Sequence, residues 1–411
     1  MEMDWLSELV PPPETRLPVN IHNVAHLLVP PILFYYATAV LVILPGTFYA
    51  RLALLPLTLW SAFRASTKLD FALPFDDDRL IYLNHGLLLV MTALALKAIV
   101  WTSELNPYYR VKPGTTEKLS GSEPEQPSLW QVATDAFDLS VNLRGLGWNW
   151  SKGLCVPKEW RPTDSRTRFL LPTFKSVALT ILVCDFLHFT IQWLGPTTFG
   201  TSAGGTIFDP SLPPLQRYIR STFISFLGGF VIVNAIQLGY YGTTIVGVLV
   251  FRGDPANWPP AFEEPWFATS LNEFWTKRWH QIFRDIFIGV GAKPLYLIFG
   301  KPGIVAGAFL VSAVLHVFGL WGMGRGTEFW SVGGFFLLMG FGIVLEHVYK
   351  AATGKRVGGY AGHMWTIIWV VGWGNLLIDA WFRKGLAGSV FFPAGWRPTE
   401  IILDVVKRIA L

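Results

Sequence analysis

Residues 304–321, IVAGAFLVSAVLHVFGLW, form an apolar stretch with a single ionisable side chain, His316. Apolar stretches of about 18 residues or more predict membrane-spanning helices, because ~20 residues cross the hydrocarbon core. Ionisable side chains at that depth are rare and usually functional, since hydrocarbon solvates them poorly. Ser312 and Gly319 lie on the same helical face as His316, which predicts a polar strip beside a gap for substrate. We therefore treat His316 as a candidate catalytic residue on a catalytic helix; a histidine bonded only for packing is the alternative.

The composition extends this prediction to the whole chain. Only 15% of the 411 residues are charged and 52% are hydrophobic, whereas soluble domains carry about 25% charged residues. We predict an all-α, polytopic integral membrane protein with about eight transmembrane helices. Residues 1–411 are expected to form a single membrane-embedded domain, and the sequence does not fix its oligomeric state.

Other apolar stretches predict further spans at 24–44, 80–101, 169–193, 329–348 and 364–381. Residues 48–63 are shorter and predict either a span or a re-entrant arm. Residues 218–251 exceed one ~30 Å core at 1.5 Å per residue, so we expect Gly239 and Gly242 to divide or bend this stretch. Lys97 is expected to snorkel at a span end.

The stretches between the spans divide into a long polar segment and a shorter amphipathic one. Residues 102–168 are rich in Pro, Gly and charge and predict a polar, partly cytosolic loop. Residues 270–289, SLNEFWTKRWHQIFRDIFIG, begin with Ser270 and Glu273 in a capping-box pattern. Helical spacing sets Trp275, Trp279, Ile282 and Ile286 on one side, opposite Glu273, Lys277, His280 and Arg284. We predict an amphipathic helix at the membrane interface.

Two functions are open for the 270–289 segment. An ordinary surface-lying helix would show the same pattern. Alternatively, Lys277, Arg278 and Arg284 attract an anionic ligand such as a phosphate group while His280 points into a reaction chamber. The net charge of +5 is compatible with charged substrates, and the chain has no basic run of the kind that binds nucleic acid.

The sequence offers little support for a metal site, a disulfide or a phosphate-binding loop. Cys155 and Cys184 lie far apart in sequence and form no disulfide or metal pattern. The aspartates at 76–78 have no second acidic cluster with which to hold magnesium. Asp185 and His188 could bind a metal or relay protons, but we favour a helix-end hydrogen bond. We predict no metal site.

Several segments together resemble a known family. Residues 265–285, PWFATSLNEFWTKRWHQIFRD, and 312–319, SAVLHVFG, are similar to the membrane-bound O-acyltransferase superfamily and, more narrowly, to wax-synthase-like acyltransferases of fungi. Residues 144–150, RGLGWNW, and 356–381, RVGGYAGHMWTIIWVVGWGNLLIDAW, are also similar to segments of that group. The likeness runs from about Ser128 to the C-terminus, while the first hundred or so residues match only in being hydrophobic.

The resemblance implies many helices around a tunnel, with acyl-CoA entering from the cytosolic side and an alcohol from the bilayer or the other face. His316 matches the catalytic histidine of the superfamily. His280 stands where many relatives have an asparagine, so it either donates to the thioester carbonyl or holds substrate. The lipid bilayer, acyl-CoA and a hydrophobic alcohol are the expected partners, and acyl-CoA is a co-substrate rather than a cofactor; no cofactor is expected.

The chemistry implied is direct acyl transfer, in which His316 is the general base, a role worth about 10²–10⁴-fold in rate. His280, Ser312 and the Trp279 N–H are candidate donors to the oxyanion. Lys277, Arg278 and Arg284 would bind phosphate, and Trp275 would face the acyl chain. No Cys or Ser has the setting of an activated nucleophile, so no acyl-enzyme is expected.

Three functions are compared. The first is transfer of an acyl group, preferably acetyl, to a terpenoid-type secondary-metabolite alcohol at the endoplasmic reticulum. The second is wax ester synthesis from a fatty acyl-CoA and a long-chain alcohol. The third is a non-enzymatic transporter, which often shows internal repeats that this sequence lacks. Neither the donor chain length nor the acceptor follows from the sequence.

Overall fold

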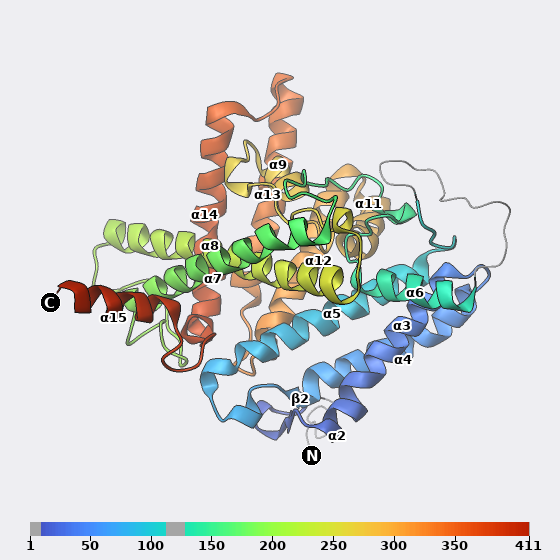
Figure 1. The fold of residues 1–411 in the computed structure, drawn as a ribbon. Coiled ribbons are helices and arrows are strands. Elements are labelled where there is room, and N and C mark those ends of the chain that lie inside the picture. The colour runs from blue at the N-terminus through green and yellow to red at the C-terminus, as the bar shows by residue number, and fades with distance from the viewer. Residues whose placement is uncertain (1–9, 112–127, 411) are drawn as a thin grey trace, which may run out of the picture. The chain divides into compact units, whose positions relative to one another are not determined.

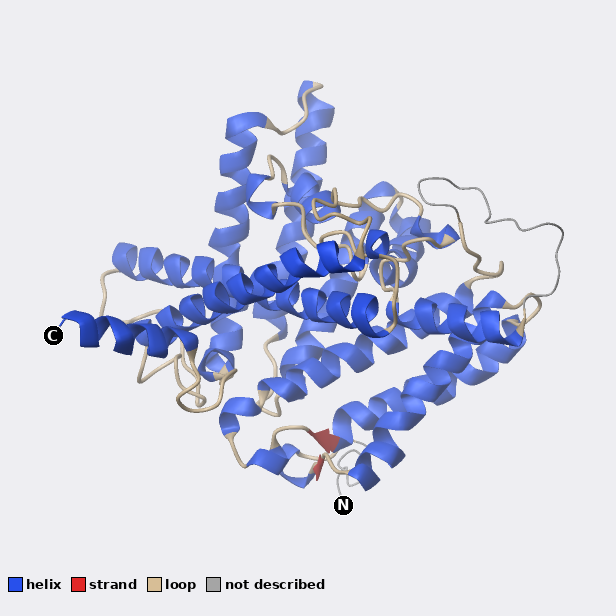
Figure 2. Ribbon diagram, in the orientation of Figure 1, coloured by secondary structure: helices blue, strands red, loops and turns tan. Residues whose placement is uncertain are grey.

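The computed structural model describes residues 10–111 and 128–410 (Figure 1). Part of the predicted 102–168 loop, residues 112–127, lies outside the described residues. Helices account for nearly all regular structure in the described ranges (Figure 2). The two short strands, β1 (Leu17–Pro18) and β2 (Leu69–Asp70), pair in parallel with Leu17 opposite Leu69.

The chain forms two compact units, each assembled from segments that are separated in sequence. The first unit comprises Met1–Asp77, Ile81–Leu154 and Gln281–Phe329. The second unit comprises Asp78–Leu80, Cys155–His280 and Trp330–Leu411. His316 therefore belongs to the first unit and His280 to the second. The expected single domain stays a prediction.

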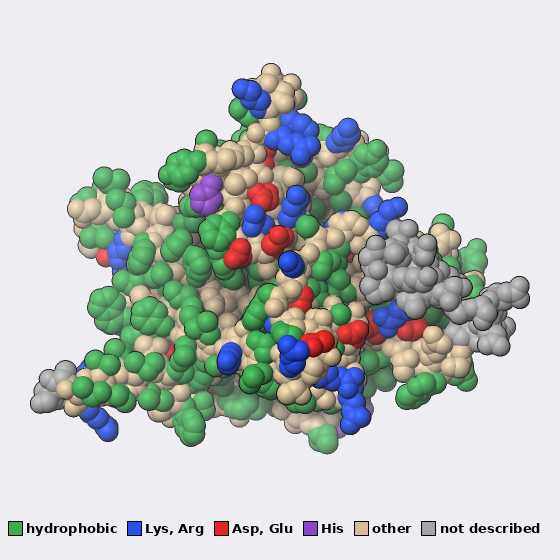
Figure 3. All heavy atoms as spheres, turned by 45° about the horizontal axis from the view of Figure 1, so that its top comes forward, with side chains coloured by type: hydrophobic (Ala, Val, Ile, Leu, Met, Phe, Trp, Pro, Cys, Tyr) green, Lys and Arg blue, Asp and Glu red, His purple; other side chains and the backbone are tan. Residues whose placement is uncertain are grey.

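Seven helices within the described residues are long and apolar enough to cross a membrane: Ile21–Ile43, Asp78–Ser103, Arg166–Leu194, Pro214–Val250, Lys301–Gly322, Phe329–Thr353 and Gly359–Arg383. The prediction of an all-α, polytopic membrane protein is confirmed. Large hydrophobic side chains such as Tyr49, Leu297 and Trp330 are exposed, and hydrophobic side chains cover much of the face in Figure 3. Lipid would cover such surface in a membrane protein.

The first unit contains α2 (Ile21–Asn23), α3 (Val29–Ile43), α4 (Phe48–Lys68), α5 (Tyr82–Ser103), α6 (Leu129–Val141), α10 (Arg284–Ile286), α11 (Lys293–Phe299) and α12 (Lys301–Gly322). The second unit contains α7 (Arg166–Leu194), α8 (Pro214–Ile245), α9 (Leu271–Glu273), α13 (Phe329–Thr353), α14 (Gly359–Arg383) and α15 (Pro398–Ala410), α13 beginning at the unit boundary. Short 3-10 turns lie at Pro13–Thr15, Leu73–Phe75, Asp78–Leu80, Asn149–Ser151, Pro255–Asn257, Pro265–Phe267 and Leu386–Gly388, and π-helical segments at Val24–Leu28, Val246–Val250, Phe274–Arg278 and Phe287–Ala292.

One expectation about helices is corrected and another stays a prediction. α8 continues through Gly239 and Gly242 and passes into the π-helical segment Val246–Val250, so neither glycine divides it. Nothing lies within 4 Å of the position that a Cβ would take at either glycine, so neither glycine is needed for a close approach of another segment. A glycine alone weakens a helix by only about 1 kcal/mol, which is too little to break it. α4 forms one helix and is not among the seven apolar candidates, so the choice between a span and a re-entrant arm for residues 48–63 stays a prediction.

The 102–168 segment is not only a loop, because it contributes α6 and a folded turn to the first unit. Ser128 caps α6 by accepting a hydrogen bond from the N–H of Gln131. Tyr36 of α3 donates to the carbonyl of Ala133 at 2.9 Å, which ties α6 to α3. Trp148 is almost fully buried and donates through Nε1 to Asp138 at 2.8 Å. The RGLGWNW motif is thus part of the core of this unit.

Lys97 does not snorkel. Its side chain is 1% exposed and its Nζ lies 2.5 Å from Asp285 Oδ2. The same Nζ lies 3.6 Å from the centroid of the Trp150 ring, a cation–π arrangement. Burial without a counter-charge would be very unfavourable for an ammonium group, so the carboxylate of Asp285 makes this position possible.

Glycines let α12 approach the segment that precedes it. A Cβ on Gly307 would lie 2.2 Å from the carbonyl oxygen of Gly291, in the π-helical segment Phe287–Ala292. A Cβ on Gly303 would lie 2.1 Å from the carbonyl oxygen of Leu295 in α11. Both contacts are with backbone atoms, which cannot rotate away, so these two positions require glycine.

We predict that Gly307→Ala lowers the melting temperature of the detergent-solubilised protein, because the added methyl overlaps a backbone oxygen. Overpacking of this kind costs about 1–3 kcal/mol. Gly86→Ala in α5 is the matched control, since nothing lies within 4 Å of its Cβ position. The measurement is a thermal unfolding curve of both variants; equal melting temperatures would contradict the close approach.

Candidate active site

His316 lies in the interior of α12, as predicted. Its ring nitrogen Nδ1 lies 2.8 Å from the backbone carbonyl oxygen of Ser312, one helical turn earlier. A carbonyl oxygen can only accept, so Nδ1 carries the proton. In the neutral imidazole the other nitrogen, Nε2, then carries a lone pair. The helix therefore sets this histidine in the tautomer in which Nε2 is the basic atom.

The polar strip on α12 differs in part from the prediction. Ser312 is 7% exposed and contacts His316 through its backbone carbonyl, whereas we expected its hydroxyl to matter. Gly319 does not leave a gap for substrate. A Cβ there would lie 2.8 Å from Leu89 Cδ2 and 3.1 Å from His85 Cε1, both side chains of α5. The missing side chain is used for helix packing, because α5 and α12 pack against each other.

Residues 270–289 do not form the predicted single amphipathic helix. The segment comprises α9, a π-helical turn at Phe274–Arg278, a break at Trp279 and then α10. Trp279 has extended backbone angles, φ −73° and ψ 151°. The spacing that places side chains on a common helical face ends at this residue, and the two predicted faces do not exist as continuous surfaces. The predicted start is confirmed: Ser270 Oγ accepts from the N–H of Glu273 at 3.0 Å.

His280 directly follows the break and packs among aromatic rings of the second unit. Its ring meets Phe262 edge-on, with centroids 5.6 Å apart, and lies 5.6 Å from the Trp279 ring. Trp275 and Trp279 lie 5.4 Å apart and both contact Phe274. Trp275, predicted to face the acyl chain, and Trp279, a candidate oxyanion donor, therefore form an aromatic cluster beside His280.

The predicted cations are arranged differently from a phosphate-binding face. Arg278 donates through Nε to Glu273 Oε1 at 2.7 Å and through Nη1 to the carbonyl of Glu263 at 3.0 Å, so it braces the turn. Lys277 is exposed. Arg284 belongs to the first unit and its Nη1 lies 3.5 Å from the Lys152 carbonyl. Their role in binding an anion stays a prediction.

The carboxylate of Glu273 accepts from the backbone N–H and hydroxyl of Thr269, each at 2.8 Å, besides its bond to Arg278. Partial burial by itself raises the pKa of Glu273, but these hydrogen bonds outweigh burial and hold the pKa below its ordinary value. Glu273 is thus an anion fixed within the turn that precedes His280, where it ties together both ends of the π-helical segment.

Sequence reasoning missed the side chains that hold this segment in the second unit. Glu346 of α13 is 6% exposed. It accepts from the N–H groups of Leu271 and Asn272 at 2.6 and 3.0 Å, and from Trp365 Nε1 at 3.0 Å. His363 of α14 donates through Nδ1 to the carbonyl of Ala268 at 3.0 Å. The signal available in the sequence was a carboxylate within an otherwise apolar predicted helix.

We predict that Glu346→Ala lowers thermal stability by about 1–3 kcal/mol, because the buried N–H of Leu271 and two partly buried N–H donors lose their acceptor. Acyl transfer should fall with it, since the start of the His280 segment is released. The neighbouring His347 is exposed, so His347→Ala is the control. Melting temperature and turnover of both variants measure the effect; similar values for the two would show that Glu346 does not anchor the segment.

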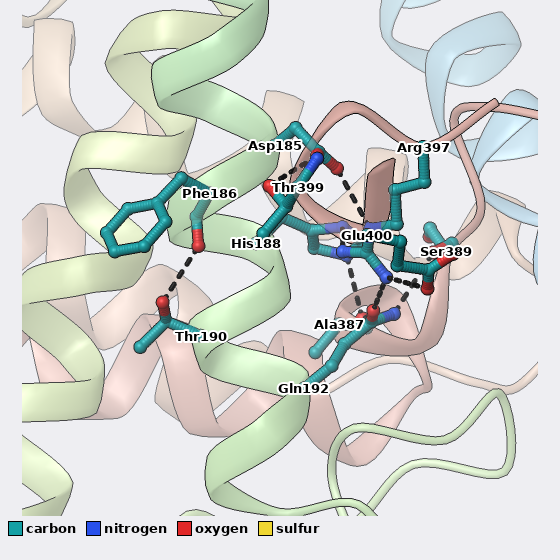
Figure 4. A network of polar contacts seen from close by, with 10 residues as sticks. All are labelled: Asp185, Phe186, His188, Thr190, Gln192, Ala387, Ser389, Arg397, Thr399 and Glu400. Carbon is teal, nitrogen blue, oxygen red and sulfur yellow. Dashed lines mark hydrogen bonds and ion pairs between the residues drawn. The ribbon is translucent and has the colours of Figure 1, made fainter. Parts of the chain in front are cut away.

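Asp185 and His188 on α7 are engaged in a buried polar network of the second unit (Figure 4). Asp185 accepts from Arg397 Nε at 2.9 Å and from the N–H and hydroxyl of Thr399 at 2.8 and 2.6 Å. His188 Nε2 donates to the carbonyl of Ala387 at 2.9 Å. Asp185 therefore pairs with a cation 212 positions away, which α7 alone could not reveal. Nowhere in 10–111 and 128–410 do three or more His, Cys, Asp or Glu side chains group to hold a metal ion.

The comparisons with known proteins bear on the same segments. Residues 258–338, which include both His280 and His316, match the membrane bound O-acyl transferase family. This stretch of the chain is similar to that family. Together with the relatives below, the match supports an O-acyltransferase, which takes an acyl donor and an alcohol acceptor in a membrane.

Among similar proteins, acetyltransferase ple2 of Rhodocybe pseudopiperita is 25% identical over 60% of this chain and 66% of its own length. Acetyltransferase eriL of Hericium erinaceus is 29% identical over 65% of this chain and 71% of its own. A long-chain-alcohol O-fatty-acyltransferase of Simmondsia chinensis is 32% identical over 24% of this chain and 30% of its own. The O-acyltransferase thus has both acetyl-transferring and fatty-acyl-transferring relatives.

Proposed function

We propose that this O-acyltransferase transfers an acetyl group from acetyl-CoA to the hydroxyl of a hydrophobic, terpenoid-type secondary-metabolite alcohol in the endoplasmic reticulum membrane. The observation that carries the chemistry is the Nδ1 contact of His316 with the Ser312 carbonyl, which leaves Nε2 as the basic atom. The preference for acetyl is supported by the fungal relatives that are named acetyltransferases.

In the proposed reaction, His316 Nε2 takes the proton of the alcohol as its oxygen attacks the thioester carbonyl carbon. The C–S bond then breaks, and the coenzyme A thiolate takes the proton from the imidazolium, which gives an ester and free coenzyme A. Atoms and charge balance without an acyl-enzyme. The oxyanion requires a donor, and His280 is our first candidate, ahead of the Ser312 hydroxyl and the Trp279 N–H.

A second candidate is wax ester synthesis from a fatty acyl-CoA and a long-chain alcohol. The Simmondsia chinensis relative favours it, although that match covers only 106 residues. Microsomes that contain the enzyme, supplied with labelled acetyl-CoA or palmitoyl-CoA and a panel of terpenoid and straight-chain alcohols, distinguish the two. Labelled acetate esters of terpenoid alcohols are expected; palmitate esters of long-chain alcohols alone would replace the first proposal with the second.

We predict that His316→Ala reduces ester formation by at least about 10²-fold, because the general base is lost. The protein should still accumulate in membranes, since α12 stays apolar. His26→Ala, at an exposed histidine, is the control and should keep full turnover. Turnover is measured as release of free coenzyme A per molecule of membrane-inserted enzyme, and substantial activity in His316→Ala would refute the assignment.

We further predict that His280→Asn keeps partial activity whereas His280→Ala does not. An amide can donate a hydrogen bond to the thioester carbonyl, as an imidazole can, and a methyl group cannot. Loss of one oxyanion donor typically lowers the rate by about 10²–10³-fold. Initial rates of the two variants at saturating substrate provide the test, and equal rates would exclude a polar role for this side chain.

A further inference from the structure

A second histidine lies against α12 close to His316. His85 is in the first turn of α5, in the same unit as α12. Its Cε1 would be 3.1 Å from a Cβ on Gly319, the residue one turn after His316. Any side chain at 319 would push this ring away, so the glycine admits His85 to the backbone of α12. Sequence pattern does not single out His85, because it lies near one end of the predicted span 80–101.

The backbone of α12 offers His85 an acceptor at this point. In a regular helix the Gly319 carbonyl would accept from the N–H of Met323. The N–H of Met323 instead bonds to the carbonyls of Leu320 and Trp321 as the helix ends. The last carbonyls of a helix need other partners, and the His85 ring, which lies against Gly319, is placed to donate to the Gly319 carbonyl.

The contact lies one helical turn from the candidate base, because Gly319 follows His316 by three residues on the same face of α12. Leu89, one turn further along α5, packs on the same glycine, with Cδ2 at 2.8 Å from the Cβ position. One polar and one apolar side chain of α5 therefore pack against the turn of α12 that follows His316.

We propose that His85 is a positioning residue for His316: its hydrogen bond to the Gly319 carbonyl fixes the end of α12 and thereby the placement of the His316 ring. This inference rests on the proposed role of His316. Small displacements of a reacting group lower turnover strongly, with about 1 Å sufficient for a 10²-fold loss. His85 itself need not touch the substrate.

The test compares His85→Phe, which keeps an aromatic ring without an N–H, with His85→Gln, which keeps an N–H donor. Leu89→Ala is the matched control, because it removes packing on Gly319 but no hydrogen bond. We expect His85→Phe to lower kcat roughly 10–100-fold, with KM for acetyl-CoA and for the alcohol within about twofold of wild type. His85→Gln should recover most of kcat, and Leu89→Ala should lower the melting temperature more than kcat.

Equal losses of kcat in His85→Phe and Leu89→Ala would overturn the proposal, because packing alone would then explain them. Wild-type kcat in His85→Phe would overturn it too. If His85→Phe does not accumulate, His85→Gln decides: recovery of kcat supports a donor role, and a loss as large as that of His316→Ala overturns it. Retained turnover in His316→Ala would refute the proposed function itself, whereas an inactive His316→Ala with a fully active His85→Phe refutes only this inference.

Discussion

Polar groups within the depth of a membrane must find their partners inside the protein, because hydrocarbon offers none. The buried polar side chains of this chain follow that constraint in pairs and small networks. Lys97 meets Asp285 in the first unit, and Asp185 meets Arg397 and Thr399 in the second. These contacts join segments that are far apart in sequence, so satisfying the polar groups also decides which helices pack together.

The same constraint shapes the candidate base. His316 satisfies one ring nitrogen with a carbonyl of its own helix, which leaves the chemistry to the other nitrogen. An intrahelical partner keeps the tautomer independent of the packing of neighbouring helices. The surroundings then act on position, and α5 supplies His85 and Leu89 against Gly319 for that purpose.

The segment before His280 is held by contacts with other helices rather than within a single regular helix. Its short α9 begins with a capping box, and its first N–H groups are taken by Glu346 from α13. The π-helical turn and the break at Trp279 end the helical spacing, and Glu273 and Arg278 hold the turn together. At the break, the N–H of Trp279 bonds to the carbonyl of Phe274 and the carbonyl of Arg278 accepts from the N–H of Glu263. Side chains of α13 and α14 bond to the residues just before this turn. His280 is therefore carried by a braced turn rather than by a surface helix.

Local pattern was enough to predict the membrane-spanning helices, the position of His316 in α12 and the capped start at Ser270, because hydrophobic runs and caps act over one or a few turns. Tertiary structure alone decided the break at Trp279, the continuity of α8, the burial of Lys97 by Asp285 and the anchoring roles of Glu346 and Arg397. It also brought His85 to Gly319, where the sequence had predicted open space. The physical reason is that a charged residue or a glycine within an apolar helix is visible in the sequence, but its contact partner is not. That partner can lie anywhere along the chain, and only the packing of the helices brings the two together.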